Sequence, residues 1–233
     1  MWYLYFVGGM MAFWSVFLTL VFRLEKRTVW QYGDLERLPP CGDSSGYGTR
    51  WMDDAVASGF TMLGWTRDVR GGIYQFSHAL LVSAQRDVFA VISVGSVGRI
   101  PFAATWLHTP TSDGRSYYST DKQSGVQIDL SHNWTNQLAP SGRFRDLLQQ
   151  HRDWLRLNGV TVRPFTEGRE LAEFRTQRES HYRAMERAGL IRFTDSTANH
   201  FYFTFPGAAR TATWSYFLGM ARQLSAGKYP RNA

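Results

Sequence analysis

Residues 73–94 read IYQFSHALLVSAQRDVFAVISV, and this stretch decides the fold class. Two apolar runs, 73–83 and 88–94, flank the short polar segment 84–87. Runs of this length that are rich in Val, Ile, Phe and Tyr, with a few polar residues between them, are typical of a β-hairpin. The stretch therefore predicts two antiparallel strands joined by a tight turn.

Further strands are predicted on both sides of this hairpin. Segments 102–109 and 115–120 flank the tripeptide Ser-Asp-Gly at 112–114, in which Asp-Gly is a strong turn signal. Residues 126–130 alternate between apolar and polar, as a half-buried strand does. Residues 60–65 add an earlier strand. Together these segments predict an antiparallel meander.

Helices are predicted after the meander. Residues 141–158 place their apolar side chains on one face and end at Asn158-Gly159, a typical C-terminal stop. Residues 167–188 form a second amphipathic pattern, and a last helix is expected over 208–224. Helices that follow a mostly antiparallel sheet indicate the α+β class, with the helices packed on one face of the sheet.

The N-terminal segment 1–22 contains no charged side chain. At 1.5 Å per residue, a helix of this length spans about 30 Å, the thickness of the hydrocarbon core of a bilayer. The segment lacks the basic start and the small-residue cleavage site of a signal peptide. We therefore expect a single uncleaved transmembrane helix over 1–22.

The charges that flank this segment predict its orientation. Arg23, Lys26 and Arg27 follow it closely, and no basic residue precedes it. The positive-inside rule then places the N-terminus outside the cell membrane and the C-terminal domain in the cytoplasm. We expect these three residues and Trp30 to lie at the membrane surface, beside anionic lipid headgroups.

Chain breakers set the expected domain boundaries. The run PPCGDSSGYG at 39–48 is typical of a loop. We expect a juxtamembrane connector over 23–50, a cytoplasmic α+β domain over 51–227 and a short tail over 228–233. A domain of this size can bury a core without disulfides.

Small residues line one face of the predicted N-terminal helix. Gly8, Ala12, Ser15 and Thr19 are spaced by four, three and four residues, so they lie on the same side of a helix. Helices in membranes associate through faces that allow close approach of their backbones. The stripe predicts packing against a transmembrane helix of another protein.

The sequence contains no catalytic, cofactor or metal signature. The lone Cys41 lies in the connector, with no neighbouring base or helix N-terminus that would activate it. No two histidines have the spacing of a metal site; they are His78, His108, His132, His151, His181 and His200. We therefore expect a protein that is not an enzyme and that holds neither a cofactor nor a metal.

The segment 188–208 resembles the wing of a winged-helix DNA-binding domain. Its sequence AGLIRF at 188–193 is followed by HFYFTF at 200–205, as when a recognition helix runs into a hairpin. The resemblance implies contact with DNA. That family also has two helices joined by a short turn before the wing, whereas a single unbroken helix is predicted here.

These observations favour a non-catalytic accessory subunit that docks on a larger membrane protein complex. In this interpretation the N-terminal helix packs beside the partner, and the basic domain, in a chain of net charge +7, covers its cytoplasmic surface or contacts anionic lipid. The alternative is a membrane-tethered regulatory domain that binds nucleic acid through the wing-like segment, and nucleic acid is the less expected partner.

Overall fold

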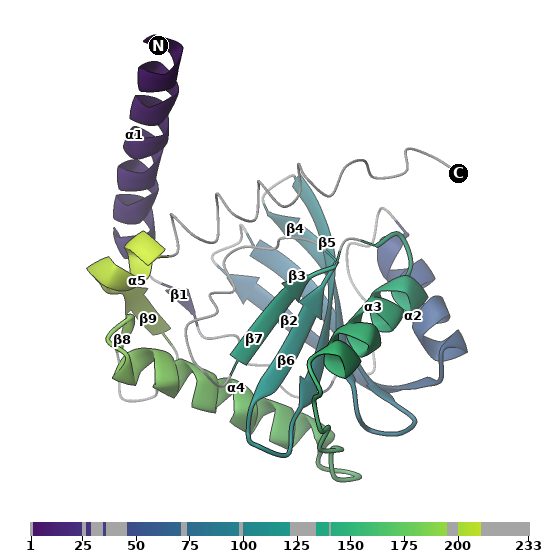
Figure 1. Cartoon of the computed structure of the whole chain (residues 1–233). Helices are drawn as coiled ribbons and strands as arrows, with labels where there is room; N and C mark the ends of the chain where they lie inside the picture. Colours follow the sequence, from purple (N-terminus) through teal and green to yellow (C-terminus); the bar gives the residue numbers. More distant parts are fainter. Residues whose placement is uncertain are drawn as a thin grey trace. The chain divides into compact units, whose positions relative to one another are not determined.

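The computed structural model describes residues 2–24, 27–28, 35, 46–70, 74–97, 100–121, 134–139, 141–194 and 200–210. The chain forms two compact units. One unit, here called the sheet unit, comprises 32–124 and 132–178. The other, here called the terminal unit, comprises 1–31, 125–131 and 179–233 (Figure 1).

The sheet unit is built on a six-stranded sheet whose strands lie side by side in chain order. All neighbouring strands are antiparallel except the last two, which are parallel. The strands are β2 (Phe60–Arg70), β3 (Tyr74–Ser83), β4 (Phe89–Val97), β5 (Ile100–Pro110), β6 (Ser116–Thr120) and β7 (Trp134–Leu138).

The predicted hairpin over 73–94 is confirmed. β3 and β4 pair with Leu81 opposite Ala90 and His78 opposite Ser93. Because β3 also pairs with β2, and β4 with β5, the hairpin lies in the interior of the sheet. Successive residues in both strands, Leu80 and Leu81 in β3 and Val91 and Ile92 in β4, are buried, so both faces of the hairpin are covered by other parts of the chain.

The other predicted strands have mixed outcomes. The segments 60–65, 102–109 and 115–120 are confirmed as parts of β2, β5 and β6. The predicted strand 126–130 lies outside the described residues. The sequence pattern did not indicate β7 or the isolated bridge between Thr111 and Val162.

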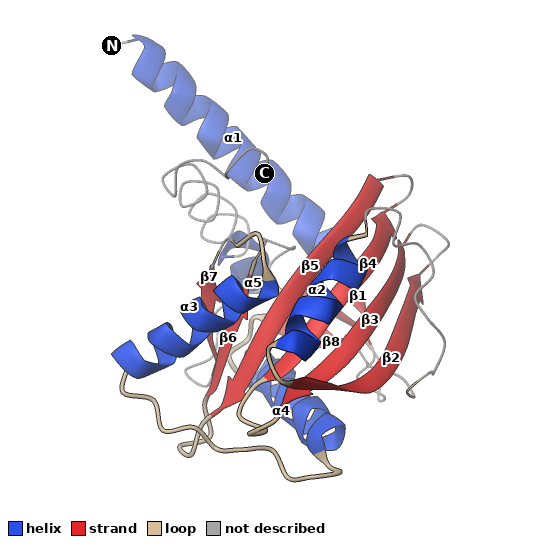
Figure 2. Ribbon diagram, turned by 90° about the vertical axis from the view of Figure 1, so that its right-hand side faces the viewer, coloured by secondary structure: helices blue, strands red, loops and turns tan. Residues whose placement is uncertain are grey.

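Two helices, α2 (Tyr47–Ala57) and α3 (Phe144–Leu157), cover one face of the sheet (Figure 2). Phe144 at the start of α3 is fully buried. Its ring centroid lies 6.3 Å from that of Trp51 in α2 and 4.9 Å from that of Phe60 in β2. Leu81 and Ile92 are buried in the same cluster. This cluster confirms the predicted helix at 141–158 and is the main core.

A third helix, α4 (Glu170–Arg187), places its first half against the opposite face of the sheet. Phe174 is buried and stacks on Phe89 of β4 with 4.3 Å between ring centroids. Phe89 and Ile92 lie three residues apart on one strand, so their side chains point to opposite faces. The predicted helix over 167–188 is confirmed, but helices cover both faces of the sheet instead of the one face predicted.

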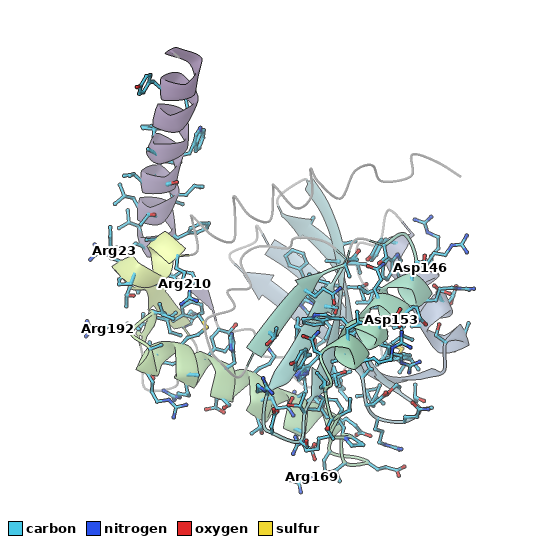
Figure 3. All side chains as sticks on the ribbon, viewed as in Figure 1. Arg23, Asp146, Asp153, Arg169, Arg192 and Arg210 are labelled. Carbon is cyan, nitrogen blue, oxygen red and sulfur yellow. The ribbon has the colours of Figure 1, made fainter. Side chains whose placement is uncertain are left out.

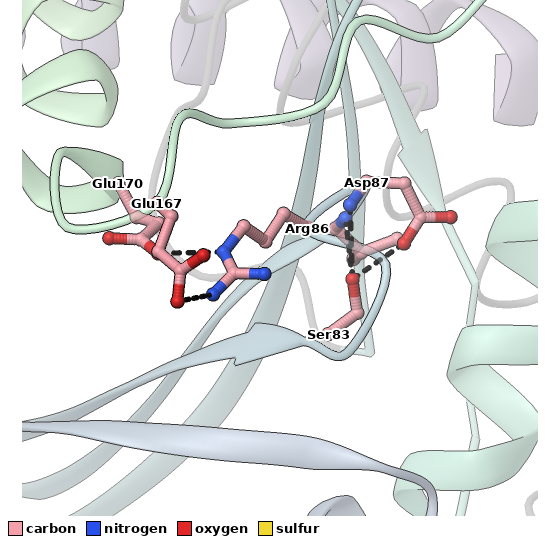
Figure 4. A network of polar contacts seen from close by, with 6 residues as sticks. Ser83, Arg86, Asp87, Glu167 and Glu170 are labelled. Atoms are coloured by element: carbon pink, nitrogen blue, oxygen red, sulfur yellow. Dashed lines mark hydrogen bonds and ion pairs between the residues drawn. The ribbon is translucent and has the colours of Figure 1, made fainter.

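A polar network ties the β3–β4 turn to the start of α4 (Figure 4). Arg86 in this turn has a φ of 54°, a left-handed conformation that is rare outside glycine. Its Nη2 lies 2.7 Å from a carboxylate oxygen of Glu167, and its Nε donates to Glu170 at 3.1 Å. Ser83 closes the turn by donating to the Asp87 carboxylate at 2.5 Å.

The terminal unit contains a small antiparallel sheet in the order β1–β9–β8. A separate apolar cluster joins Phe22, Met185, Phe201 and Phe203. A Cβ at Gly207 would lie 1.9 Å from the carbonyl oxygen of Leu190, so only glycine allows this close approach. The elements are α1 (Trp2–Leu24), β1 (Arg27–Thr28), β8 (Ile191–Phe193), β9 (His200–Phe203) and α5 (Phe205–Arg210).

The predicted transmembrane helix over 1–22 is wrong. In the part of the chain that the structure describes, no helix is long and apolar enough to cross a membrane. The last turns of α1 pack on the terminal unit itself, where Thr19 and Phe22 are buried. The predicted placement of the chain as a single-pass protein of the cell membrane is wrong for the same reason.

The main core gives the first prediction. Phe144→Ala should lower the free energy of unfolding by about 3–5 kcal/mol, because it removes a fully buried ring and leaves a cavity. Leu157→Ala at the end of the same helix should change it by less than about 0.5 kcal/mol, because Leu157 is 81% exposed. Urea unfolding followed by circular dichroism measures both; equal losses would contradict this core assignment.

The turn at Arg86 gives a second prediction. Arg86→Ala should be less stable than Arg86→Gly by about 1 kcal/mol. Both variants lose the contacts with Glu167 and Glu170, but only glycine adopts the left-handed conformation without strain. The comparison uses the same urea titration, and an alanine variant as stable as the glycine variant would rule out strain at this position.

Candidate functional site

The most unusual surface in the described part of the chain is the apolar side of α1. Large apolar side chains are exposed along the helix, among them Phe13 at 63% and Phe17 at 46%. A folded protein rarely leaves so many neighbouring apolar side chains in water unless they contact another molecule. We call this set the apolar arc; it comprises Tyr5, Met10, Phe13, Trp14, Val16, Phe17, Leu20, Val21 and Leu24.

The apolar arc lies opposite the side of α1 that packs on the terminal unit. At 100° per residue, its members span about 180° of the helix circumference. The opposite side carries Leu18, Thr19 and Phe22, which are half-buried or buried. Only one side of the last turns of α1 is therefore covered by the rest of the terminal unit.

Three rings form the centre of the apolar arc. Phe13 stacks on Phe17 with 6.3 Å between ring centroids, and the indole of Trp14 contacts Phe17 edge-on at 5.6 Å. These contacts within one helix hold the rings side by side and lower the entropy lost when a partner covers them. Rigid aromatic groups of this kind are common anchors of protein interfaces.

The predicted small-residue stripe lies on the side of α1 that turns toward the terminal unit. Thr19 is buried there and donates its hydroxyl to the carbonyl of Ser15 at 2.6 Å. Ser15 is half-buried, and Ala12 is exposed. The side-chain surroundings of Gly8 lie outside the described residues. Contact of this stripe with another protein stays a prediction.

The residues predicted at a membrane surface are only partly described. Arg23 is exposed in the last turn of α1, and Arg27 lies in β1, where it pairs with Phe201. Lys26 and Trp30 lie outside the described residues. Their predicted contact with anionic headgroups stays a prediction.

His151 is a fully buried histidine of the sheet unit, and both of its ring nitrogens form hydrogen bonds. Thr109 donates its hydroxyl to the carbonyl of Asp87 at 2.9 Å. Its oxygen therefore accepts a hydrogen bond from the Nε2–H group of His151 at 2.9 Å. Nδ1 is then the acceptor for Ser119, whose hydroxyl lies 2.7 Å away. Burial lowers the pKa of His151 to about 3, and the charge of Arg152 adds to this effect. The neutral ring fastens α3 to β5 and β6.

The pairing of Ser119 with His151 has the residue types of a nucleophile and its base. Both residues are fully buried, so no substrate has access to the serine oxygen. The low pKa of His151 also makes the ring a poor base near neutral pH. The pair is therefore a structural contact.

His108 lies on the opposite face of the sheet, under α4. It is buried against Tyr118 and Phe174, with ring centroids 5.5 and 5.1 Å away. Burial lowers its pKa well below the usual value, and the positive charge of Arg178 lowers it further. Arg178 donates to the hydroxyl of Tyr118 at 3.1 Å, which holds α4 on the sheet.

Asp121 is a buried carboxylate that fixes the first turn of α2. One of its oxygens accepts the hydroxyl proton of Tyr47 at 2.6 Å, and the other accepts the amide of Thr105 at 2.7 Å. Tyr47 and Asp121 are 74 residues apart, so no local sequence pattern predicts this contact. The carboxylate is satisfied by hydrogen bonds within the fold.

No metal site is present in the described ranges, where no three His, Cys, Asp or Glu side chains gather to hold an ion. His78 is buried, with its Nδ1 2.5 Å from the hydroxyl of Ser93 on the neighbouring strand. Cys41 and His132 lie outside the described residues. The expectation that the protein is not an enzyme stays a prediction.

The wing-like segment forms a hairpin in which β8 pairs with β9 and β9 pairs with β1. The single helix α4 precedes it, as the sequence indicated. Arg192 is exposed on the side of β8 away from the apolar cluster, opposite Tyr202. The two helices that a winged helix needs before its wing do not occur in the described stretch 141–194 in the required arrangement.

His151 and His108 together give a prediction about pH. Both are neutral in the folded state, whereas in the unfolded chain they take up protons below their ordinary pKa of 6.5. The contribution of these two histidines to the free energy of unfolding should therefore be constant well above pH 6.5. It should fall by about 1.4 kcal/mol per pH unit from His151 as the pH is lowered toward 4, and His108 adds a fall in the same direction.

The matched variant is His151→Gln, whose amide can donate to Thr109 but does not titrate. Below pH 6, this variant should reduce the slope of the free energy of unfolding against pH by about 1.4 kcal/mol per pH unit, which is the contribution of one titrating group. Urea unfolding at a series of pH values measures the slope. A slope identical to that of the unchanged chain would show that His151 is protonated in the folded state.

Comparison with other proteins adds no candidate for this site. No known protein family, curated protein or solved structure matches this chain. The described buried ionisable groups of the sheet unit stabilise the fold, whereas the described residues leave the side chains of the apolar arc of α1 largely exposed. The apolar arc is therefore the candidate functional site.

Proposed function

We propose that this protein is a non-catalytic docking subunit that inserts the apolar arc of α1 into an apolar groove of a partner protein. The observation that carries the proposal is the exposure of rings at the centre of this helix, where Phe13, Trp14 and Phe17 are each 45–63% exposed. An amphipathic or apolar helix laid into a groove is a recurring mode of protein recognition.

The energetics support a partner. Covering one large apolar side chain contributes about 1.5–3 kcal/mol, so several half-exposed rings together supply a strong driving force for association. The terminal unit already covers Thr19 and Phe22, which fixes the direction in which α1 leaves it. A pre-oriented helix loses less freedom on binding than a flexible one.

The width of the apolar arc supports a groove over a single neighbouring helix. A helix that packs alongside another buries a stripe about 100° wide. The apolar arc spans about 180°, so one helix would leave part of it in water. A groove that contacts the helix on two or three sides covers all of it.

The described buried groups support a role without catalysis. His108 and His151 are neutral and enclosed, and Asp121 is satisfied by Tyr47 and Thr105. None of these groups is accessible to a substrate. Their arrangement suits a rigid sheet unit.

Site-specific photocross-linking tests the proposal. A photoreactive phenylalanine analogue at Phe13, and in a second chain at Phe17, should give one protein adduct of constant mass when the full chain is made in its own cells. The control is the same analogue at Leu157, which is more exposed than either but lies outside the apolar arc. It should give less than about a tenth of the adduct.

The adduct should disappear when Val16 and Leu20 are changed to Ser in the chain that carries the analogue at Phe13. These changes keep the helix in place, because both side chains point away from the terminal unit. Equal labelling from Leu157, an adduct with a second copy of this chain, or an adduct with lipid would each overturn the proposal.

A further inference from the structure

We infer that the partner groove carries a rim of Asp or Glu side chains where it meets the base of α1. This inference rests on the proposed function, and it adds the charge of the partner to its shape. The terminal unit supplies the observation, since basic side chains gather on its described surface near the end of the apolar arc.

The described charged side chains of the terminal unit are mostly arginines. Five arginines stand against two glutamates, a net charge of +3, and one of the glutamates, Glu186, already accepts from Arg183 at 3.2 Å. The arginines are Arg23, Arg183, Arg187, Arg192 and Arg210, and all five are exposed. Arg23 is exposed in the last turn of α1, and a partner that covers it without an opposite charge would bury an uncompensated cation, at a cost of several kcal/mol.

Two of these arginines lie at the base of the helix. Arg23 occupies the last turn of α1 directly beside Leu24 of the apolar arc. Arg210 ends α5, the helix that contacts α1. Arg192 on β8 extends the basic surface along the same unit (Figure 3). A groove that encloses the apolar arc down to Leu24 therefore reaches Arg23 first.

Carboxylates fit this surface better than the phosphates of a nucleic acid. A guanidinium binds both anions through paired N–H groups, so the arginines alone do not decide between them. The adjacent apolar arc decides, because a groove that covers half the circumference of an apolar helix must itself be apolar. A nucleic acid backbone offers no such groove, whereas a protein offers both an apolar floor and a charged rim.

The experiment converts the arginines into reporters of carboxylates. A water-soluble carbodiimide joins a lysine amine to a carboxyl group in contact with it and does not join arginine. Arg23→Lys and Arg210→Lys are each made in the full chain and treated in extracts of its own cells. The unchanged chain, with lysines at 26, 122 and 228, sets the background. Arg152→Lys, exposed on α3 of the sheet unit, is the matched control.

The expected result is an adduct from Arg23→Lys at least about fivefold above background, joined through an Asp or Glu of the protein that the photoreactive analogue at Phe13 captures. Arg152→Lys should stay at background. If the Phe13 adduct forms but both base variants stay at background, the acidic rim is wrong and the docking function stands. If no Phe13 adduct forms, the docking function itself fails, and the rim fails with it.

Two further outcomes would overturn the acidic rim. The first is co-sedimentation of the full chain with vesicles of 30% phosphatidylserine that is abolished by Arg23→Glu, because the anion would then be a lipid phosphate or headgroup. The second is salt-sensitive retention of duplex DNA that is lost in the same variant. In either case the base arginines serve another anion.

Discussion

The pairing of β3 with β4 is the constraint on which the rest of the sheet unit depends. Alternating side chains of both strands are buried, Leu80 and Leu81 in one and Val91 and Ile92 in the other, so the hairpin is covered on two sides. Phe144 of α3 closes one side and Phe174 of α4 closes the other. The Arg86 turn, which joins the two strands, also contacts Glu167 and Glu170 at the start of α4. One hairpin therefore sets the positions of the strands beside it and of the helices above and below it.

This two-sided burial explains why the described polar groups of the sheet are enclosed without being reactive. His151 and His108 lie on opposite faces, each under a helix, and burial keeps both neutral. Each is held by groups that fasten a helix to the sheet, Thr109 and Ser119 in one case and the Tyr118 ring in the other. The same residue types would suggest chemistry if they faced a cleft. Here the hydrogen bonds of His151 join α3 to β5 and β6, and the ring of His108 packs against Tyr118 and Phe174 under α4.

Sequence patterns predicted the strands, turns and helices that depend on residues close together in the chain. The apolar runs around the β3–β4 turn, the Asp113-Gly114 turn and the amphipathic helices α3 and α4 are all present. The sequence did not predict α2, because Gly46 and Gly48 suggest a loop, and its start is fixed by the distant Asp121. The candidate site was predicted only in part. The uncharged apolar run predicted a transmembrane helix, which is wrong: the rest of the terminal unit buries Thr19 and Phe22, and sequence spacing does not reveal that contact.

The central claim is that a partner covers the apolar arc of α1 in the functioning protein. Hydroxyl-radical footprinting tests it directly, because Met10 and Trp14 are reactive side chains and both are 45% exposed. The oxidation rates of these residues are compared between the purified chain and the chain in freshly opened cells, with the half-buried Trp154 of the sheet unit as the internal reference. If the apolar arc is covered, Met10 and Trp14 are oxidised at least about fivefold more slowly in the cell extract, while the oxidation rate of Trp154 is unchanged. Equal rates in both samples would contradict it, because the apolar arc would then stay in water.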